Sequence, residues 1–187
     1  NNLTFGFSLV TTRRLDAAET EAMNALNHIL NGTMSSRIFG EARRRGLVYG
    51  MGSGISHSIN YSSWDFDGEV NEDSAEELFD LIQHEMVKTL NGDIEESEID
   101  AAKSYALGRY QMWAQTVNQI SDYYAASYFS TGEINHYDQI PTIIKKIDKA
   151  TIVELAREFA GSNIHAFVVV GSCEKALVSA LETRLKF

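Results

Sequence analysis

Residues 47–69 read LVYGMGSGISHSINYSSWDFDGE, and side chains of two kinds alternate along both halves of this stretch. A period of two is typical of β-strands, in which successive side chains point to opposite faces. In the first half, one face carries Tyr49, Met51, Ser53, Ile55, His57 and Ile59, and the other carries Gly50, Gly52 and Gly54. In the second half, Trp64, Phe66 and Gly68 alternate with Asp65, Asp67 and Glu69. We therefore predict a hairpin that turns at residues 60–63. Its glycine-lined face would let a neighbouring backbone or helix approach closely.

The rest of the chain predicts two further strands and a series of helices. Alternation predicts a strand over residues 3–11, and an apolar run predicts a short buried strand over residues 166–170. Apolar residues spaced three and four apart predict helices over residues 16–31, 35–45, 71–90 and 95–110, and the helical pattern after 110 continues to about residue 128. Three more helices are predicted towards the C-terminus: a short one that begins at Pro141, one capped by Thr151, and a last one that begins near Glu174. This order predicts an α+β layered sandwich, in which helices cover a mainly antiparallel sheet. We expect a single domain over residues 1–187.

The composition excludes several classes of function. The 187 residues are 44% hydrophobic and carry a formal net charge of −10. So acidic a chain is a poor ligand for nucleic acids and for anionic membranes, because both require a basic surface. One cysteine, Cys173, excludes an internal disulfide framework. No apolar run approaches the ~20 residues of a membrane-spanning helix.

The chain lacks the usual signatures of a catalytic or metal site. His84-Glu85 begins like the zinc motif H-E-x-x-H, but Lys88 stands where the second histidine is needed, and H-x-x-E-H is absent. A lysine ammonium has no lone pair for a metal. There is no phosphate-binding loop and no G-x-S-x-G elbow. We predict no metal ligand and no catalytic residue in this chain, and an inert thiol at Cys173.

A basic cluster at residues 35–49 stands out in this acidic sequence. It reads SSRIFGEARRRGLVY, so that a basic helix ends directly at the glycine-faced strand. Guanidinium donors and a phenol can hold a peptide carbonyl or a carboxylate. The alternative is structural: Arg37 or Arg45 pairs with the many acidic residues, and Tyr49 packs against the fold.

The same residues resemble a known family. The run LNGTMSSRIF at 30–39, EAR at 41–43 and GLVY at 46–49 resemble the zinc-free, C-terminal type of domain of the pitrilysin/insulinase zinc peptidases. Residues 94–103 and 136–171 resemble later segments of that domain, so the likeness runs in order through nearly the whole chain. Mitochondrial processing peptidase and many bacterial proteins belong to this family.

The resemblance implies a domain that works in a pair. One domain of such a pair carries H-x-x-E-H and binds zinc, whereas the other lacks the ligands and closes a chamber around the peptide. The chain resembles the second type, so we expect no cofactor here and zinc in a partner domain, in the same or a separate chain. The resemblance also implies that an arginine and a tyrosine of the zinc-free domain reach the substrate. Carried over to this sequence, these residues are Arg43 and Tyr49.

One departure leaves the arginine open. Between EAR and GLVY the chain is one residue shorter than the family pattern, and one residue rotates the following helical side chains by ~100°. The substrate-facing arginine is then Arg43 or Arg44, although a gap in the turn before the strand would leave Arg43 in place.

Two functions follow as expectations from the resemblance. The first is the zinc-free half of a pitrilysin-like zinc metalloendopeptidase, which is inactive alone and contributes substrate binding, chamber closure and docking to the zinc-bearing domain. The chain would then be one part of a larger peptidase, with a dimer as a further option. The alternative is a scaffold subunit of the same fold that has lost peptidase activity. Bacterial relatives favour the periplasm or the cytoplasm.

Overall fold

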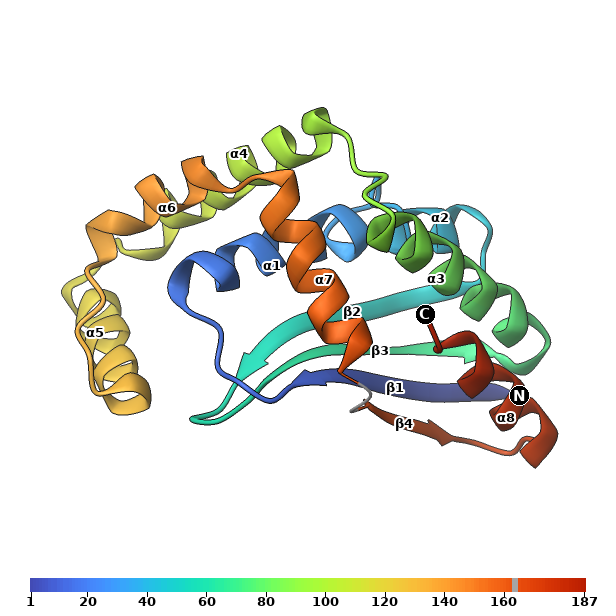
Figure 1. The fold of residues 1–187 in the computed structure, drawn as a ribbon. Helices are drawn as coiled ribbons and strands as arrows, with labels where there is room; N and C mark the ends of the chain where they lie inside the picture. Colours follow the sequence, from blue (N-terminus) through green and yellow to red (C-terminus); the bar gives the residue numbers. More distant parts are fainter. Residues whose placement is uncertain (163–164) are drawn as a thin grey trace.

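A four-stranded antiparallel sheet forms one layer of the molecule (Figure 1). The computed structural model describes residues 1–162 and 165–187. The strands are β1 (Asn2–Thr11), β2 (Val48–His57), β3 (Ser62–Asn71) and β4 (His165–Val170), in the order β2-β3-β1-β4. The predicted hairpin is β2 and β3. In the register, Phe7 of β1 pairs with Phe66 of β3 on one side and with Phe167 of β4 on the other.

The helices cover one face of this sheet. They are α1 (Ala17–Asn31), α2 (Phe39–Arg44), α3 (Ala75–Leu90), α4 (Glu96–Trp113), α5 (Val117–Thr131), α6 (Ile140–Lys146), α7 (Lys149–Gly161) and α8 (Lys175–Arg184), with short 3-10 turns η1 (Glu72–Ser74) and η2 (Tyr137–Gln139). Figure 1 shows α1 and α7 beside the sheet, α4 and α6 beyond α1, and α5 apart at one end. The predicted α+β sandwich is therefore confirmed. Within the described part of the chain, the helices lack the combined length and apolar character of a membrane span.

The core lies between the sheet and the helices. Alternate residues of β1, from Leu3 to Leu9, are buried, as are Trp64 and Phe66 of β3. The rings of Phe7 and Phe66 stack with centroids 4.4 Å apart, and Phe79 of α3 meets Phe5 edge-on at 5.2 Å. The hairpin alternation thus places its apolar side chains where α1, α3 and α7 bury them.

The opposite face of the sheet carries the polar half of the alternation. Asp65 and Asp67 project there from β3, beside the glycines of β2. A Cβ atom at Gly50 or Gly54 would meet no described atom within 4 Å, so the predicted close approach of a backbone or helix is wrong at these two positions. The physical reason is that the helices pack on the other face.

Two further predictions need correction. The strand near residues 166–170 is not buried: it is an edge strand, and Val168 and Val170 are 56% and 63% exposed because they point to the uncovered face. Thr151 does not cap α7. The helix begins three residues earlier, where the Asp148 side chain accepts a hydrogen bond from the Thr151 backbone N–H at 2.8 Å.

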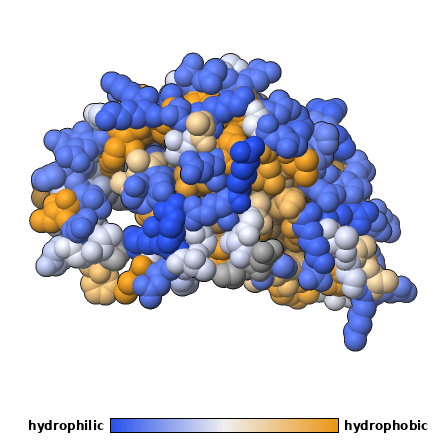
Figure 2. Space-filling model, viewed as in Figure 1, coloured by the Kyte–Doolittle hydropathy of each residue, from blue (hydrophilic) through white to orange (hydrophobic). Residues whose placement is uncertain are grey.

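The long helical pattern predicted to continue from 110 to 128 is interrupted. Ala114 leaves the helical conformation, and Thr116 begins α5 with a reciprocal cap to Gln119. Apolar side chains of α5 remain exposed, with Val117 at 84% and Phe129 at 94%. Figure 2 shows orange, apolar atoms at the surface on the left, where Figure 1 places α5.

Candidate functional site

The turn from α2 into β2 forms the corner that carries the predicted site. The Arg45 backbone N–H donates to the Glu41 carbonyl at 2.9 Å, and Gly46 then adopts a left-handed φ of 73°. The Leu47 N–H donates back to the Ala42 carbonyl at 2.9 Å. Ala42 and Leu47 are buried, so they anchor the corner to the core. The glycine allows the sharp reversal that brings the start of β2 beside the last turn of α2.

This corner brings Arg43 and Tyr49 together. The Arg43 guanidinium carbon lies 4.9 Å from the centroid of the Tyr49 ring, within the range of a cation–π contact. Arg43 also donates from Nη1 to the Val48 carbonyl at 3.3 Å. A β-bulge between Val48 and Met51 interrupts the pairing with β3, and Tyr49 is 88% exposed. Tyr49 therefore does not pack into the fold, as the structural alternative supposed, but stands on the surface beside a guanidinium.

Arg44 faces a different partner. It donates from Nε to the Glu41 carboxylate at 2.8 Å, and Arg45 donates to the same carboxylate at 2.7 Å. The hydrogen bond from Arg44, followed in importance by the one from Arg45, lowers the pKa of Glu41 to about 2. Of the two candidate arginines, the structure thus places Arg43, and not Arg44, against Tyr49. This placement fits a one-residue gap in the turn before the strand.

Arg37 has the structural role that the alternative gave it. It donates from Nε to Glu98 at 2.6 Å and from Nη1 to the Asp93 carbonyl at 2.7 Å, and its Nη1 lies 3.6 Å from a Glu85 carboxylate oxygen. Burial works to raise the pKa of Glu98, but the hydrogen bonds from Arg37 and from the Glu95 backbone outweigh it and lower that pKa. Arg37 therefore fastens the segment before α2 to the start of α4.

A groove of about 740 Å³ lies between α2 and α3, next to this corner. The charged side chains that line it include Arg43, Arg44, Arg45, Lys88, Glu41 and Glu85. Lys88 lies 3.5 Å from a Glu85 carboxylate oxygen, so the interrupted zinc motif forms an ion pair. Across residues 1–162 and 165–187, no cluster of three or more His, Cys, Asp or Glu side chains is arranged to hold a metal ion. The donor set described therefore does not fit zinc.

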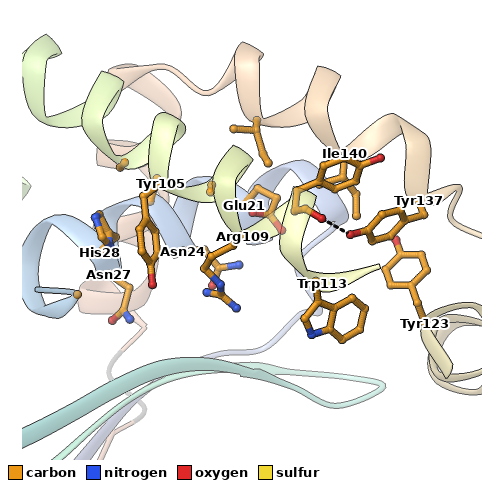
Figure 3. Close-up of a pocket in the computed structure, with 16 residues that line it drawn as sticks. Glu21, Asn24, Asn27, His28, Tyr105, Arg109, Trp113, Tyr123, Tyr137 and Ile140 are labelled. Carbon is orange, nitrogen blue, oxygen red and sulfur yellow. Dashed lines mark hydrogen bonds between the residues drawn. The ribbon is translucent and has the colours of Figure 1, made fainter. Parts of the chain in front are cut away.

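A second pocket, which the sequence patterns did not predict, lies among α1, α4, α5 and α6 (Figure 3). The rings of Tyr123 and Tyr137 meet edge-on with their centroids 5.1 Å apart. Together with Trp113 they also form one wall of the pocket. The richness in tyrosine was the available signal, but the helix break at residues 114–116 that folds these rings together was not predicted.

Comparisons with known proteins place this geometry in a family. The sequence profile described as the peptidase M16 inactive domain matches residues 1–105. A search of the curated proteins gave no match.

Three solved structures share the fold. A peptidase M16 inactive domain from Pseudomonas fluorescens has a TM-score of 0.77 and 18% identity, over 90% of this chain and 40% of that chain. Complex III2 from Candida albicans contains a chain with a TM-score of 0.79 and 11% identity, over 98% of this chain and 46% of that chain. The inactive peptidase domain of a protein described as a zinc protease from Bordetella parapertussis has a TM-score of 0.72 and 11% identity, over 94% of this chain and 95% of that chain. The chain thus spans less than half the length of the first two.

Proposed function

Because the chain belongs to the family of peptidase M16 inactive domains, we propose that it is the zinc-free half of a zinc metalloendopeptidase. In this role it binds the peptide substrate, helps to close the chamber around it and docks to a domain that carries H-x-x-E-H. Zinc in that domain supplies the polarisation of the scissile carbonyl and the activation of water. The residues of this chain supply substrate contacts.

The observation that carries the proposal is the exposed pair of Arg43 and Tyr49. Among the described residues, Arg43 makes one hydrogen bond, to the Val48 carbonyl, so most of its N–H donors are available to a ligand. The Tyr49 ring holds the guanidinium from one side while its own hydroxyl faces solvent. Two donors fixed side by side suit a peptide carbonyl. Such donors accelerate a reaction when they bind the developing oxyanion more strongly than the ground-state carbonyl.

The exposed apolar side chains of α5 support the docking role. Val117 and Phe129 lie almost fully in solvent, and a partner domain that covered them would bury apolar area. Half or more of each of two matched chains lies outside the region that this chain spans. In the proposed peptidase, the zinc-bearing domain is the occupant of this surface.

The test measures kinetics in the assembled peptidase, that is, this chain together with its H-x-x-E-H domain. Arg43→Gln and Tyr49→Phe each remove donors from the pair, so we expect kcat/KM to fall about 10- to 100-fold for each. Arg44→Gln removes the neighbouring charge, which is engaged by Glu41, and is expected to change kcat/KM less than about twofold. Equal losses for Arg43→Gln and Arg44→Gln, or no loss for Tyr49→Phe, would contradict the assignment.

The scaffold function remains the second candidate, because the fold matches a chain of Complex III2 over 98% of this chain. A scaffold has no scissile carbonyl to hold. The two functions therefore differ in the partner: the peptidase requires H-x-x-E-H in the domain that docks here. A purified native assembly whose every chain lacks that motif would favour the scaffold.

A further inference from the structure

The second pocket is enclosed by aromatic rings on two sides. It has a volume of about 330 Å³, at the lower end of the range for small-molecule sites. On one side, His28 of α1 stacks on Tyr105 of α4 with ring centroids 4.0 Å apart. On the other side stand Trp113, Tyr123 and Tyr137, and the Trp113 and Tyr137 centroids lie 6.4 Å apart (Figure 3). Aromatic rings of this kind offer faces and edges against which a flat apolar group can pack.

Two residues of opposite charge, Arg109 and Glu21, line the pocket between the aromatic rings. Figure 3 shows Arg109 and Glu21 in the space between Tyr105 and Trp113. Within the described part of the chain, Arg109 has no salt bridge or hydrogen bond; its guanidinium carbon lies 6.0 Å from the Tyr105 centroid, the outer limit of a cation–π contact. Burial raises the pKa of Glu21, and both Asn24 and the charge of Arg109 oppose this shift. The two charges therefore influence each other without pairing directly.

We propose that this pocket binds an aromatic α-carboxylate: the carboxylate on Arg109, the N–H of the α-nitrogen on Glu21, and the aromatic side chain between the walls. An unpaired guanidinium is a strong donor for a carboxylate. A phosphate ligand is disfavoured, because it would bring a second negative charge toward Glu21. The same chemistry occurs in a free aromatic amino acid and in the carboxyl-terminal residue of a peptide. The pocket is not lined by Arg43 or Tyr49, so a failure of this proposal and a failure of the proposed function can be told apart.

The experiment titrates the purified full chain with N-acetyl-L-phenylalanine and follows both heat and Trp fluorescence. Of the two tryptophans, Trp64 is fully buried in the core and Trp113 lines the pocket, so binding should change the Trp113 emission. N-acetyl-L-phenylalanine amide, which lacks the carboxylate, serves as the matched probe, and we expect it to bind at least about tenfold more weakly. Free L-phenylalanine separates the two sources of the ligand.

Variants assign the contacts. Arg109→Gln is expected to weaken N-acetyl-L-phenylalanine about tenfold or more and to abolish the preference over the amide. Lys145→Gln removes a charge from the exposed side of α6 and should leave both affinities unchanged. If L-phenylalanine binds at least tenfold more tightly than the acetylated probe, the ligand is the free amino acid; if not, it is a peptide terminus. Three results would overturn the proposal: neither N-acetyl-L-phenylalanine nor L-phenylalanine binds at millimolar concentrations, the acid and its amide bind equally well, or Arg109→Gln leaves the affinity for the acid unchanged.

Discussion

Arg13 connects three elements through one guanidinium. From the loop after β1, it lies 2.7 Å from a Glu19 oxygen on α1 and 2.6 Å from a Glu158 oxygen on α7. The Thr11 hydroxyl donates to the same Glu158 carboxylate at 2.6 Å. The hydrogen bond from Arg13 is the main cause that lowers the pKa of Glu19, and likewise that of Glu158. This network holds the end of α7 to the sheet.

The network predicts a pH-dependent effect of Arg13→Gln. Because the folded-state pKa of both glutamates is lowered, their stabilisation is complete above the ordinary value of 4.5 and is lost as the pH falls below it. The groups are partly exposed, so we expect the variant to lose only about 1 kcal/mol at pH 7. Urea unfolding at pH 7 and at lower pH measures this difference, which should shrink in acid. A difference that grows in acid would be inconsistent with the network.

At the level of elements, α7 and α8 offer a matched pair of helix starts. Asp148 begins α7 with a side-chain hydrogen bond to the Thr151 N–H, whereas Glu174 begins α8 with no side-chain cap. We expect Asp148→Ala to lower the free energy of unfolding by about 1 kcal/mol, and Glu174→Ala to lower it by less than about half of that. Chemical denaturation of both variants compares them directly, and equal losses would show that the cap contributes nothing.

The corner between α2 and β2 depends on one glycine. At Gly46 a Cβ would meet no described atom within 4 Å, but the φ of 73° is strained for other residues. Gly46→Ala should therefore lower the free energy of unfolding by about 1–2 kcal/mol through the backbone alone. Gly50→Ala is the control, since its Cβ also meets no described atom and its φ lies outside the left-handed region. Thermal unfolding that ranks Gly50→Ala as the more damaging change would contradict this account.

The elements also show where sequence patterns suffice. Alternation located the hairpin because β3 has a buried and a solvent face. The start of α1 was predicted to within one residue because the capping pair, Asp16 and Glu19, lies only three residues apart in the chain. The exposure of β4 was not readable, because an edge strand in an apolar run looks like a central one. The family resemblance pointed to Tyr49 and to Arg43 or Arg44 as substrate contacts, which stays a prediction; only the structure shows that Arg43 lies against Tyr49 while Arg44 bonds to Glu41. The pocket around Arg109 joins helices distant in sequence, so the tyrosine-rich stretch alone could not show that a pocket forms there.

In the whole molecule, the proposed function depends on surfaces that the chain does not cover itself. One sheet face, the α5 side chains and the Arg43–Tyr49 corner all face outward. The described residues offer no group suited to a metal. If the chain is the zinc-free half proposed above, it acts only when a zinc-bearing domain supplies the hydrolytic chemistry.

The most direct measurement mixes the purified chain with a separately prepared H-x-x-E-H partner domain and follows cleavage of a fluorogenic peptide. We expect little cleavage by either component alone, robust cleavage by the mixture, and loss of that cleavage when a zinc chelator is added. Chelator-sensitive cleavage by this chain alone, or full activity of the partner without it, would contradict the proposal that this chain is the zinc-free half of a peptidase.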